Sequence, residues 1–199
     1  MIQTVIFDLG GVFIEEPAAG MLKYYASFLQ VDGEVLSEAL RKYWDVWHKG
    51  KISEAELWGM VTTELQIPCP DCESLWLDGF KQTYRERPEM FALLKQVKRQ
   101  GYTTALLSNI EAPLVQHLRQ SPFEDIDSYF FSCELGLSKP EPAIYQKVLQ
   151  ELSCAPEVAI FIDDRRANVE AASRLGIHGI VFRSYDDLRE QLQPYQIGL

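Results

Sequence analysis

Long apolar runs are missing from this 199-residue sequence, and none reaches the roughly 18 residues that a membrane span needs. The N-terminus also lacks a basic segment followed by an uninterrupted apolar core, because Asp8 breaks the first apolar stretch. A secretory signal is therefore not expected. We predict a cytoplasmic protein that does not associate with membranes.

Positive charge is scarce as well. The chain has 19 Lys and Arg residues against 29 Asp and Glu residues, which gives a formal net charge of −10. Such a protein is repelled by the phosphate backbone of nucleic acids, and no basic run offsets the repulsion, so we predict no nucleic-acid partner. A small anionic substrate would need a local cation to reverse the sign of the field.

Cysteine is limited to four residues, of which Cys69 and Cys72 form a CPDC motif. A single CxxC without a second one or a histidine pair is only half of a zinc site. The motif also follows Pro68 in a mid-chain loop, whereas a redox CxxC lies between an N-terminal strand and a helix. We interpret the cysteines as ordinary reduced residues.

The remaining composition, 47% hydrophobic and 24% charged, is typical of a globular protein with a real core. Residues 3–8 are predicted to form a strand, and residues 15–85 show helical periodicity only, including a capping box at Ser53–Glu56. One apolar stripe of this part runs from Val35 to Trp47, and its last helix is expected at 72–84. We interpret the tryptophans of these helices, Trp44 and Trp76 included, as core packing. From Pro88 onward, helices alternate with short apolar strands at 103–107, 128–132, 158–162 and 179–182. This pattern predicts an α/β fold with a parallel sheet covered on both faces, and an all-helical insertion after the first strand.

Polar residues follow these strands at their C-terminal ends, where parallel sheets bind ligands. They are Asp8, Ser108, Asn109, Lys139, Asp163 and Asp164. Each position alone has an ordinary explanation, such as a helix cap or a solvated lysine, but their occurrence together at one rim favours a site. Clustered carboxylates attract Mg²⁺, which in turn binds phosphates, and a free carboxylate can attack phosphorus.

Four segments resemble the motifs of the haloacid dehalogenase-like (HAD) superfamily: FDLGGV, LLSNI, LSKPEPAIYQ and FIDDRRANVEAASRLGI. Their order, their spacing and the helical insertion match. Within the superfamily, the DLGxV start, the SKPEPAIYQ run and the double Asp resemble the branch with α-D-glucose-1-phosphate phosphatase and the phosphatase domain of soluble epoxide hydrolases. The resemblance implies a Rossmann-like core domain at 1–14 and 86–199, with a helical cap domain at 15–85. It also implies a small phosphorylated metabolite as substrate.

The resemblance also implies a Mg²⁺ site. Asp8 would be both the nucleophile and a metal ligand, and Gly10 would offer its backbone carbonyl to the metal. Asp164 would bind the metal directly or through water, with Asp163 beside it. Asn168 stands where many members have another acid, so its role would be indirect.

Substrate contacts are implied in the same way. Ser108 and Asn109 would bind the transferring phosphoryl group, and Lys139 would neutralise charge between the nucleophile and the phosphate. In the cap, the loop WHKGKIS at 47–53 would approach the substrate, with His48 as the leading candidate. Lys49 and Lys51 are further candidates there, although solvated side chains are an equally ordinary interpretation of this loop.

Gly10 departs from the family pattern, because typical HAD phosphatases have a general acid/base aspartate at this place. Such a group contributes about 10²–10⁴-fold in rate. Our leading hypothesis is a Mg²⁺-dependent phosphatase for a small phosphomonoester, sugar phosphates included, whose leaving group needs little protonation. The alternative is a weakly active or inactive regulatory protein with the same fold. The paired Asp163 and Asp164 argue against a metal-free dehalogenase, and the missing acid argues against a mutase.

Overall fold

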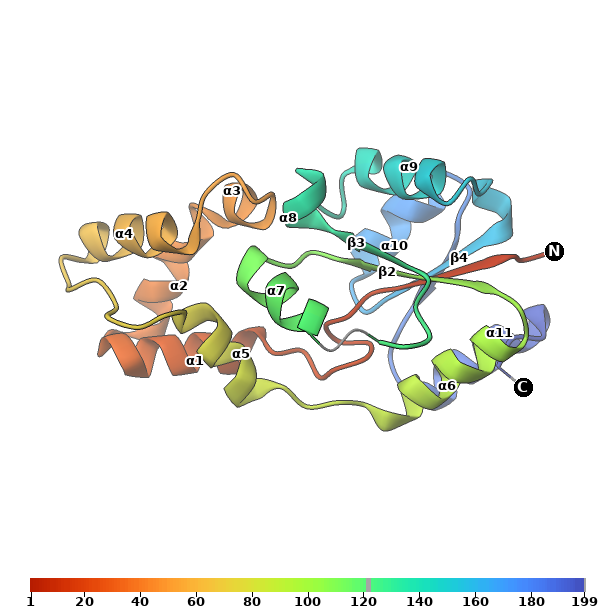
Figure 1. The fold of residues 1–199 in the computed structure, drawn as a ribbon, viewed down its shortest axis with the longest axis horizontal. Coiled ribbons are helices and arrows are strands. Elements are labelled where there is room, and N and C mark those ends of the chain that lie inside the picture. The colour runs from red at the N-terminus through yellow and green to blue at the C-terminus, as the bar shows by residue number, and fades with distance from the viewer. Residues whose placement is uncertain (121–122, 199) are drawn as a thin grey trace.

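The computed structural model describes residues 1–120 and 123–198. A five-stranded parallel sheet lies at its centre, in the order β3-β2-β1-β4-β5 (Figure 1). The strands are β1 (Thr4–Phe7), β2 (Thr103–Ser108), β3 (Ser128–Phe131), β4 (Ala159–Asp163) and β5 (His178–Val181). The predicted strands and the predicted α/β class are thus confirmed, and β1 occupies the middle of the sheet.

Each face of the sheet is covered by helices, because the central strands are apolar on both sides. Val5 and Phe7 of β1 pack into one buried cluster, whereas Ile6 packs into the other, as the two-residue period of a strand requires. The first cluster includes residues of α6 (Pro88–Arg99), α7 (Ala112–Gln120) and α11 (Tyr185–Leu192). The second includes residues of α9 (Pro142–Glu151) and α10 (Arg166–Ser173).

Five helices gather beyond one end of the sheet and form a helical layer (Figure 1). They are α1 (Ala18–Leu29), α2 (Gly33–Arg41), α3 (Trp44–His48), α4 (Glu54–Leu65) and α5 (Leu75–Thr83). The chain enters and leaves this layer through two adjacent segments, since Glu15 N donates to Arg85 O and Arg87 N donates to Phe13 O. The predicted capping box of α4 is present, with Ser53 and Glu56 each bonding the other's backbone.

Two helices of this layer differ from the sequence prediction. The apolar stripe from Val35 to Trp47 is divided between α2 and α3, and Val35 is 49% exposed. The division turns α3 so that its two last residues, Trp47 and His48, are buried. The last helix begins at Leu75 rather than at Cys72, because the Ser74 side chain accepts a hydrogen bond from the Leu77 amide and caps it.

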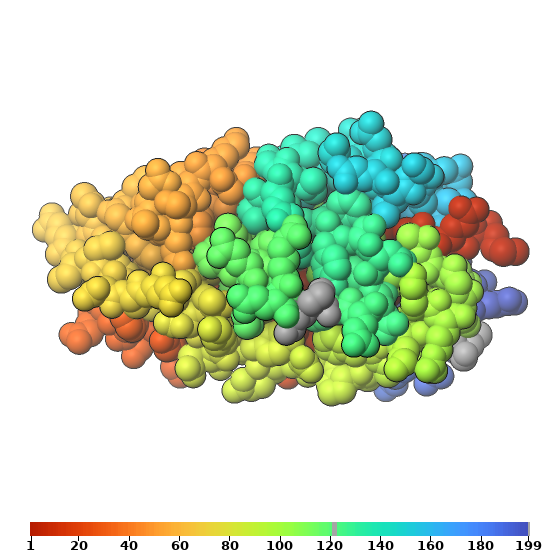
Figure 2. Space-filling view, in the orientation of Figure 1, coloured from red at the N-terminus to blue at the C-terminus, as the bar shows by residue number. Residues whose placement is uncertain are grey.

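Three short helical segments complete the described chain: α8 (Ser132–Leu135), η1 (Pro156–Val158) and η2 (Gln193–Tyr195). Within residues 1–120 and 123–198, every helix is too short or too polar to cross a membrane. The four cysteines are free thiols, and both cysteines of the CPDC motif are exposed. In the space-filling view, the orange and yellow atoms of the helical layer abut the green atoms of α7 and the teal atoms of α8 (Figure 2).

Candidate active site

The C-terminal ends of β1, β2 and β4 bring the expected polar residues to one place. Asp8 follows β1, Ser108 ends β2, and Asp163 ends β4. These strands are neighbours in the sheet, so their ends share one rim. A cavity of about 410 Å³ lies between this rim and the helical layer, and Asp8, Ser108, Asn109 and Lys139 contribute to its wall. Its volume is in the range of small-molecule sites.

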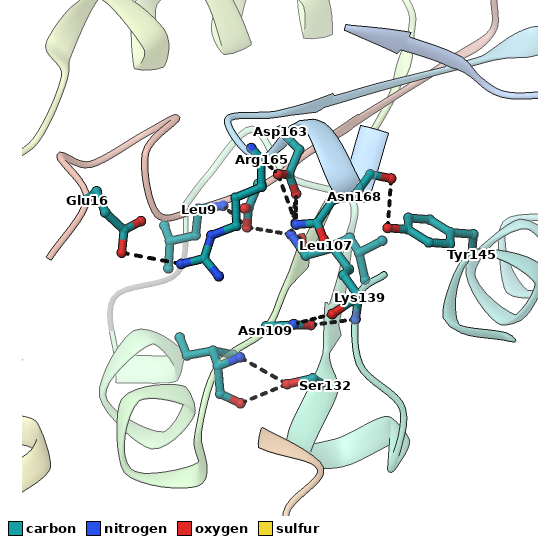
Figure 3. A network of polar contacts seen from close by, with 12 residues as sticks. Leu9, Glu16, Leu107, Asn109, Ser132, Lys139, Tyr145, Asp163, Arg165 and Asn168 are labelled. Atoms are coloured by element: carbon teal, nitrogen blue, oxygen red, sulfur yellow. Dashed lines mark hydrogen bonds and ion pairs between the residues drawn. The ribbon is translucent and has the colours of Figure 1, made fainter. Parts of the chain in front are cut away.

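Lys139 is the central cation of the site, and its side chain is only 1% exposed. The Nζ atom lies 2.8 Å from Asp8 Oδ1 and 2.7 Å from Asp163 Oδ2, and it donates a hydrogen bond to Leu107 O at 2.9 Å (Figure 3). Burial alone would lower the pKa of Lys139, but the two carboxylates outweigh burial and raise it. The lysine therefore stays charged where an anion would bind.

Asn109 holds the backbone of Lys139 in place. Its Nδ2 donates to Lys139 O at 2.9 Å, and its Oδ1 accepts from Lys139 N at 2.8 Å. Both ends of the amide are used in this way, so the Asn109 side chain positions the lysine, and its backbone N–H is the part left for the predicted phosphoryl contact. The sequence motif alone did not reveal this function of the side chain.

The two adjacent aspartates, Asp163 and Asp164, have different surroundings. Both Asp163 oxygens accept hydrogen bonds: from Arg165 N at 2.8 Å, from Asn168 Nδ2 at 3.0 Å on each oxygen, and from Lys139 Nζ (Figure 3). Burial opposes the charge of Asp163, but these donors, Lys139 first, lower its pKa. Asn168 therefore contacts the site through Asp163, and its predicted indirect role stays a prediction.

Asp164, in contrast, has a buried oxygen without a donor. In the described part of the chain, its Oδ1 is buried and has no hydrogen-bond partner. Burial, followed by the neighbouring charges of Asp163 and Glu16, raises its pKa. An unpaired buried carboxylate oxygen is costly unless something compensates for it.

The three carboxylates meet closely enough to share one ion. One oxygen each from Asp8, Asp163 and Asp164 lie within 4.8 Å of one another. Burial raises the pKa of Asp8 to about 7, and Asp163 adds to this shift while Lys139 opposes it. A hard divalent cation would relieve the repulsion and satisfy the unpaired oxygen of Asp164, so the donor set fits Mg²⁺.

The two glycines that follow β1 have different requirements. Gly11 has a positive φ of 77°, and a Cβ there would overlap the Asp164 carboxylate, so glycine is needed. Gly10 has no such restriction. A Cβ on it would meet only Glu16 Oε2 at 3.5 Å and Pro17 Cδ at 3.8 Å, which are ordinary contacts. The absence of an acid at position 10 is therefore not imposed by the backbone.

In the loop at 47–53 that was predicted to approach the substrate, the candidate residues differ in burial and in contacts. His48 is buried and contributes to the cavity wall, where its Nε2 lies 2.9 Å from Glu111 Oε1. Lys49 instead pairs with Asp45 and Glu141, and Lys51 is exposed. Among these candidates, only His48 has been found in the wall of the cavity.

Several wall residues were missed or given another role from the sequence. Trp44 and Trp76 were interpreted as core packing, but both line the cavity. No sequence pattern marked Glu111 as a cavity residue, because its partner His48 is 63 positions away in the sequence and the two meet only through folding. Glu16 also lines the cavity, and only the geometry around Gly10 draws attention to it.

Comparisons with known proteins identify the family of this chain. A family model for haloacid dehalogenase-like hydrolases matches residues 2–176. The sesquiterpene phosphatase of Aspergillus oryzae is 29% identical over 184 residues, which cover 89% of this chain and 88% of that protein. The phosphorylated carbohydrates phosphatase of Thermotoga maritima is 29% identical over 217 residues, 99% of this chain and 93% of that protein.

Some other relatives are much longer than this chain, which spans only 18% of mouse acyl-CoA dehydrogenase family member 10. Among solved structures, a HAD family enzyme of Bacteroides thetaiotaomicron in complex with magnesium and inorganic phosphate superposes with a TM-score of 0.75 at 22% identity. That superposition covers 94% of this chain and 99% of the other, and it confirms the fold. With the family model covering most of its length, the chain belongs to the haloacid dehalogenase-like hydrolase family.

Proposed function

We propose that this protein is a Mg²⁺-dependent phosphatase that hydrolyses a small phosphomonoester through an aspartyl-phosphate intermediate. The observation that carries the proposal is the position of Asp8. It lines the cavity, 2.8 Å from the buried Lys139 ammonium, and one of its oxygens lies within 4.8 Å of an Asp164 oxygen. A carboxylate in this setting is held beside a cation that also attracts the phosphate.

In this proposal Asp8, Asp164 and the Gly10 carbonyl hold the metal. Asp163 was also predicted near the metal, and we assign its two oxygens chiefly to orienting Lys139 and Asn168, which already donate to them. Bound Mg²⁺ supplies positive charge that offsets the phosphate and keeps the carboxylates ionised. Structures of the Bacteroides enzyme with magnesium support this choice of metal.

The first chemical step is attack of an Asp8 oxygen on phosphorus. The bond from phosphorus to the ester oxygen breaks, and the leaving oxygen departs with the electron pair and takes a proton from water. Ser108 and the Asn109 backbone N–H bind the phosphoryl oxygens, and Lys139 balances the charge that develops between nucleophile and phosphate. Because Gly10 donates no proton, leaving groups of low basicity react fastest.

The second step releases phosphate. Water attacks phosphorus in the aspartyl phosphate, the bond to Asp8 breaks, and the carboxylate returns to its contact with Lys139. The relatives' names give the range of esters to test: one acts on a sesquiterpene phosphate and one on phosphorylated carbohydrates. Sugar phosphates therefore stay within the proposed substrate range.

The direct test is release of inorganic phosphate from p-nitrophenyl phosphate and from a panel of phosphorylated metabolites, with and without Mg²⁺. We expect turnover that disappears with EDTA, and loss of it in Asp8→Asn. The matched control is Asp186→Asn, which changes an aspartate of α11 outside the site. Phosphate and Mg²⁺ binding without any turnover would instead favour the regulatory alternative.

A further inference from the structure

The cavity continues from the nucleophile into the helical layer, and its walls there are mainly apolar and aromatic. Asp8 and Ser108 lie at its floor, so whatever carries the phosphate must occupy the space above them. Six of the side chains that line this upper part are apolar or aromatic: Met21, Leu40, Trp44, Trp76, Phe80 and Leu114. Five of these six are buried, and Trp44 is half-buried. The leaving group therefore meets carbon surface on several sides.

Four polar side chains of this wall are connected by contacts with one another. Glu111 has one oxygen 2.9 Å from His48 Nε2, and its other oxygen accepts from Trp76 Nε1 at 2.9 Å. The Tyr25 hydroxyl donates to Trp76 O at 3.0 Å. The Trp76 and Tyr25 donors are therefore already used, and each Glu111 oxygen already has one partner, so these groups have little hydrogen-bonding capacity left for several substrate hydroxyls.

This pairing favours substrates with an apolar body over substrates with several hydroxyl groups. A sugar brings several hydroxyl groups, and each hydroxyl that is buried without a partner costs free energy. An apolar body loses no hydrogen bonds on entering and removes its own surface from water. Of the other polar residues in the cavity wall, Ser37 is half-buried and Arg41 is exposed, so both are more accessible to solvent than Glu111.

We infer that the upper cavity binds an apolar leaving group, so that phosphomonoesters of apolar alcohols or phenols are better substrates than sugar phosphates of similar size. This inference rests on the proposed phosphatase function and specifies its substrate class. The polar head of such a substrate lies at Asp8 and Lys139, and its body packs against the aromatic wall.

The first experiment compares kcat/KM for one acyl phosphate and two phosphate esters under the same conditions with Mg²⁺. Acetyl phosphate has almost no body and reports phosphoryl transfer alone. Hexyl phosphate and glucose 6-phosphate are both esters of primary alcohols, so they differ chiefly in the polarity of the body. We expect hexyl phosphate to exceed glucose 6-phosphate by at least about 10-fold in kcat/KM. If acetyl phosphate is turned over and kcat/KM for glucose 6-phosphate equals or exceeds that for hexyl phosphate, the inference is overturned but the phosphatase proposal stays intact.

Two variants test whether the preference for an apolar body comes from the cavity wall. Trp44→Ala removes a half-buried wall residue, and Phe28→Ala removes an exposed aromatic residue of α1 that is outside the wall. We expect Trp44→Ala to raise KM for hexyl phosphate several-fold with little change for acetyl phosphate, and Trp44→Phe to restore most of the affinity. Phe28→Ala should match the wild type. Equal effects of Trp44→Ala on hexyl phosphate and acetyl phosphate would show a merely structural role and overturn the inference.

Binding without turnover gives a second readout, which also decides the question if the protein proves inactive. Alkylphosphonates from methyl to octyl keep the anionic head and add one methylene at a time, and quenching of tryptophan fluorescence reports their binding. About 0.8 kcal/mol per buried methylene corresponds to an increase in affinity of up to about four-fold per step. An affinity that does not depend on chain length would overturn the inference whether or not the protein hydrolyses esters.

Discussion

Replacing Gly10 with aspartate should give the site the proton donor that it lacks. The backbone at position 10 is not left-handed, and an added Cβ would meet its nearest neighbours at 3.5 and 3.8 Å, so little steric cost is expected. A positioned general acid contributes about 10²–10⁴-fold. Because the introduced carboxyl would share its space with Glu16, we expect the lower part of that range, on the order of 10- to 100-fold.

The gain should depend on the leaving group. p-Nitrophenolate leaves without protonation, so kcat for p-nitrophenyl phosphate should change less than about three-fold in Gly10→Asp. An alkyl phosphate has a strongly basic leaving oxygen, and the full gain should appear there. Steady-state phosphate release with both esters measures the two effects in the same preparation. Gly10→Asn is the matched control, since it has the same shape but cannot act as an acid.

Two results would contradict this reasoning. Equal gains in Gly10→Asp and Gly10→Asn would mean that shape rather than proton donation matters. No gain in Gly10→Asp, together with selective loss of alkyl phosphate turnover in Glu16→Gln, would show that Glu16 already provides the proton. The second result is specific, because Glu16 Oε2 is the atom nearest to the Cβ that Gly10 lacks.

Three further predictions concern the charges around Lys139. Lys139→Met leaves Asp8 and Asp163 without their common cation, so the metal-free protein should lose about 3–5 kcal/mol in urea unfolding, with Lys147→Met as the exposed control. Asn109→Ala removes two hydrogen bonds to the Lys139 backbone, so kcat should fall about 10-fold or more, and an unchanged kcat would refute its positioning role. In EDTA, the pKa of Asp8 is about 7 in the folded protein and 3.8 in the unfolded chain. The free energy of unfolding should therefore be highest below pH 4 and decrease as the pH rises through 7. Urea unfolding at several pH values checks this, since Asp8→Asn should lack that decline.

The sequence predicted the sheet and the position of the site for a clear physical reason. Short β-branched strands between helices allow only a parallel sheet that is buried on both faces, and polar residues directly after such strands must share one rim. Asp8, Ser108 and Lys139 could therefore be assigned to the cavity in advance. The helix boundaries near Arg41 and Cys72 could not be predicted from the sequence, because the packing of Trp47 and the Ser74 cap decided them.

Only the tertiary structure decided which site residues are hydrogen-bonded to one another and which have a free ligand atom. Asp163 and Asp164 are neighbours in the sequence, yet one accepts hydrogen bonds on both oxygens and the other has a buried oxygen with no partner in the described residues. Glu111 meets His48 and Trp76 only because the helical layer packs against the start of α7. The sequence by itself determined which chemical groups reach the rim, because each strand end carries its own residues. Which of those groups remain free to bind a ligand depends on partners that lie far away along the chain.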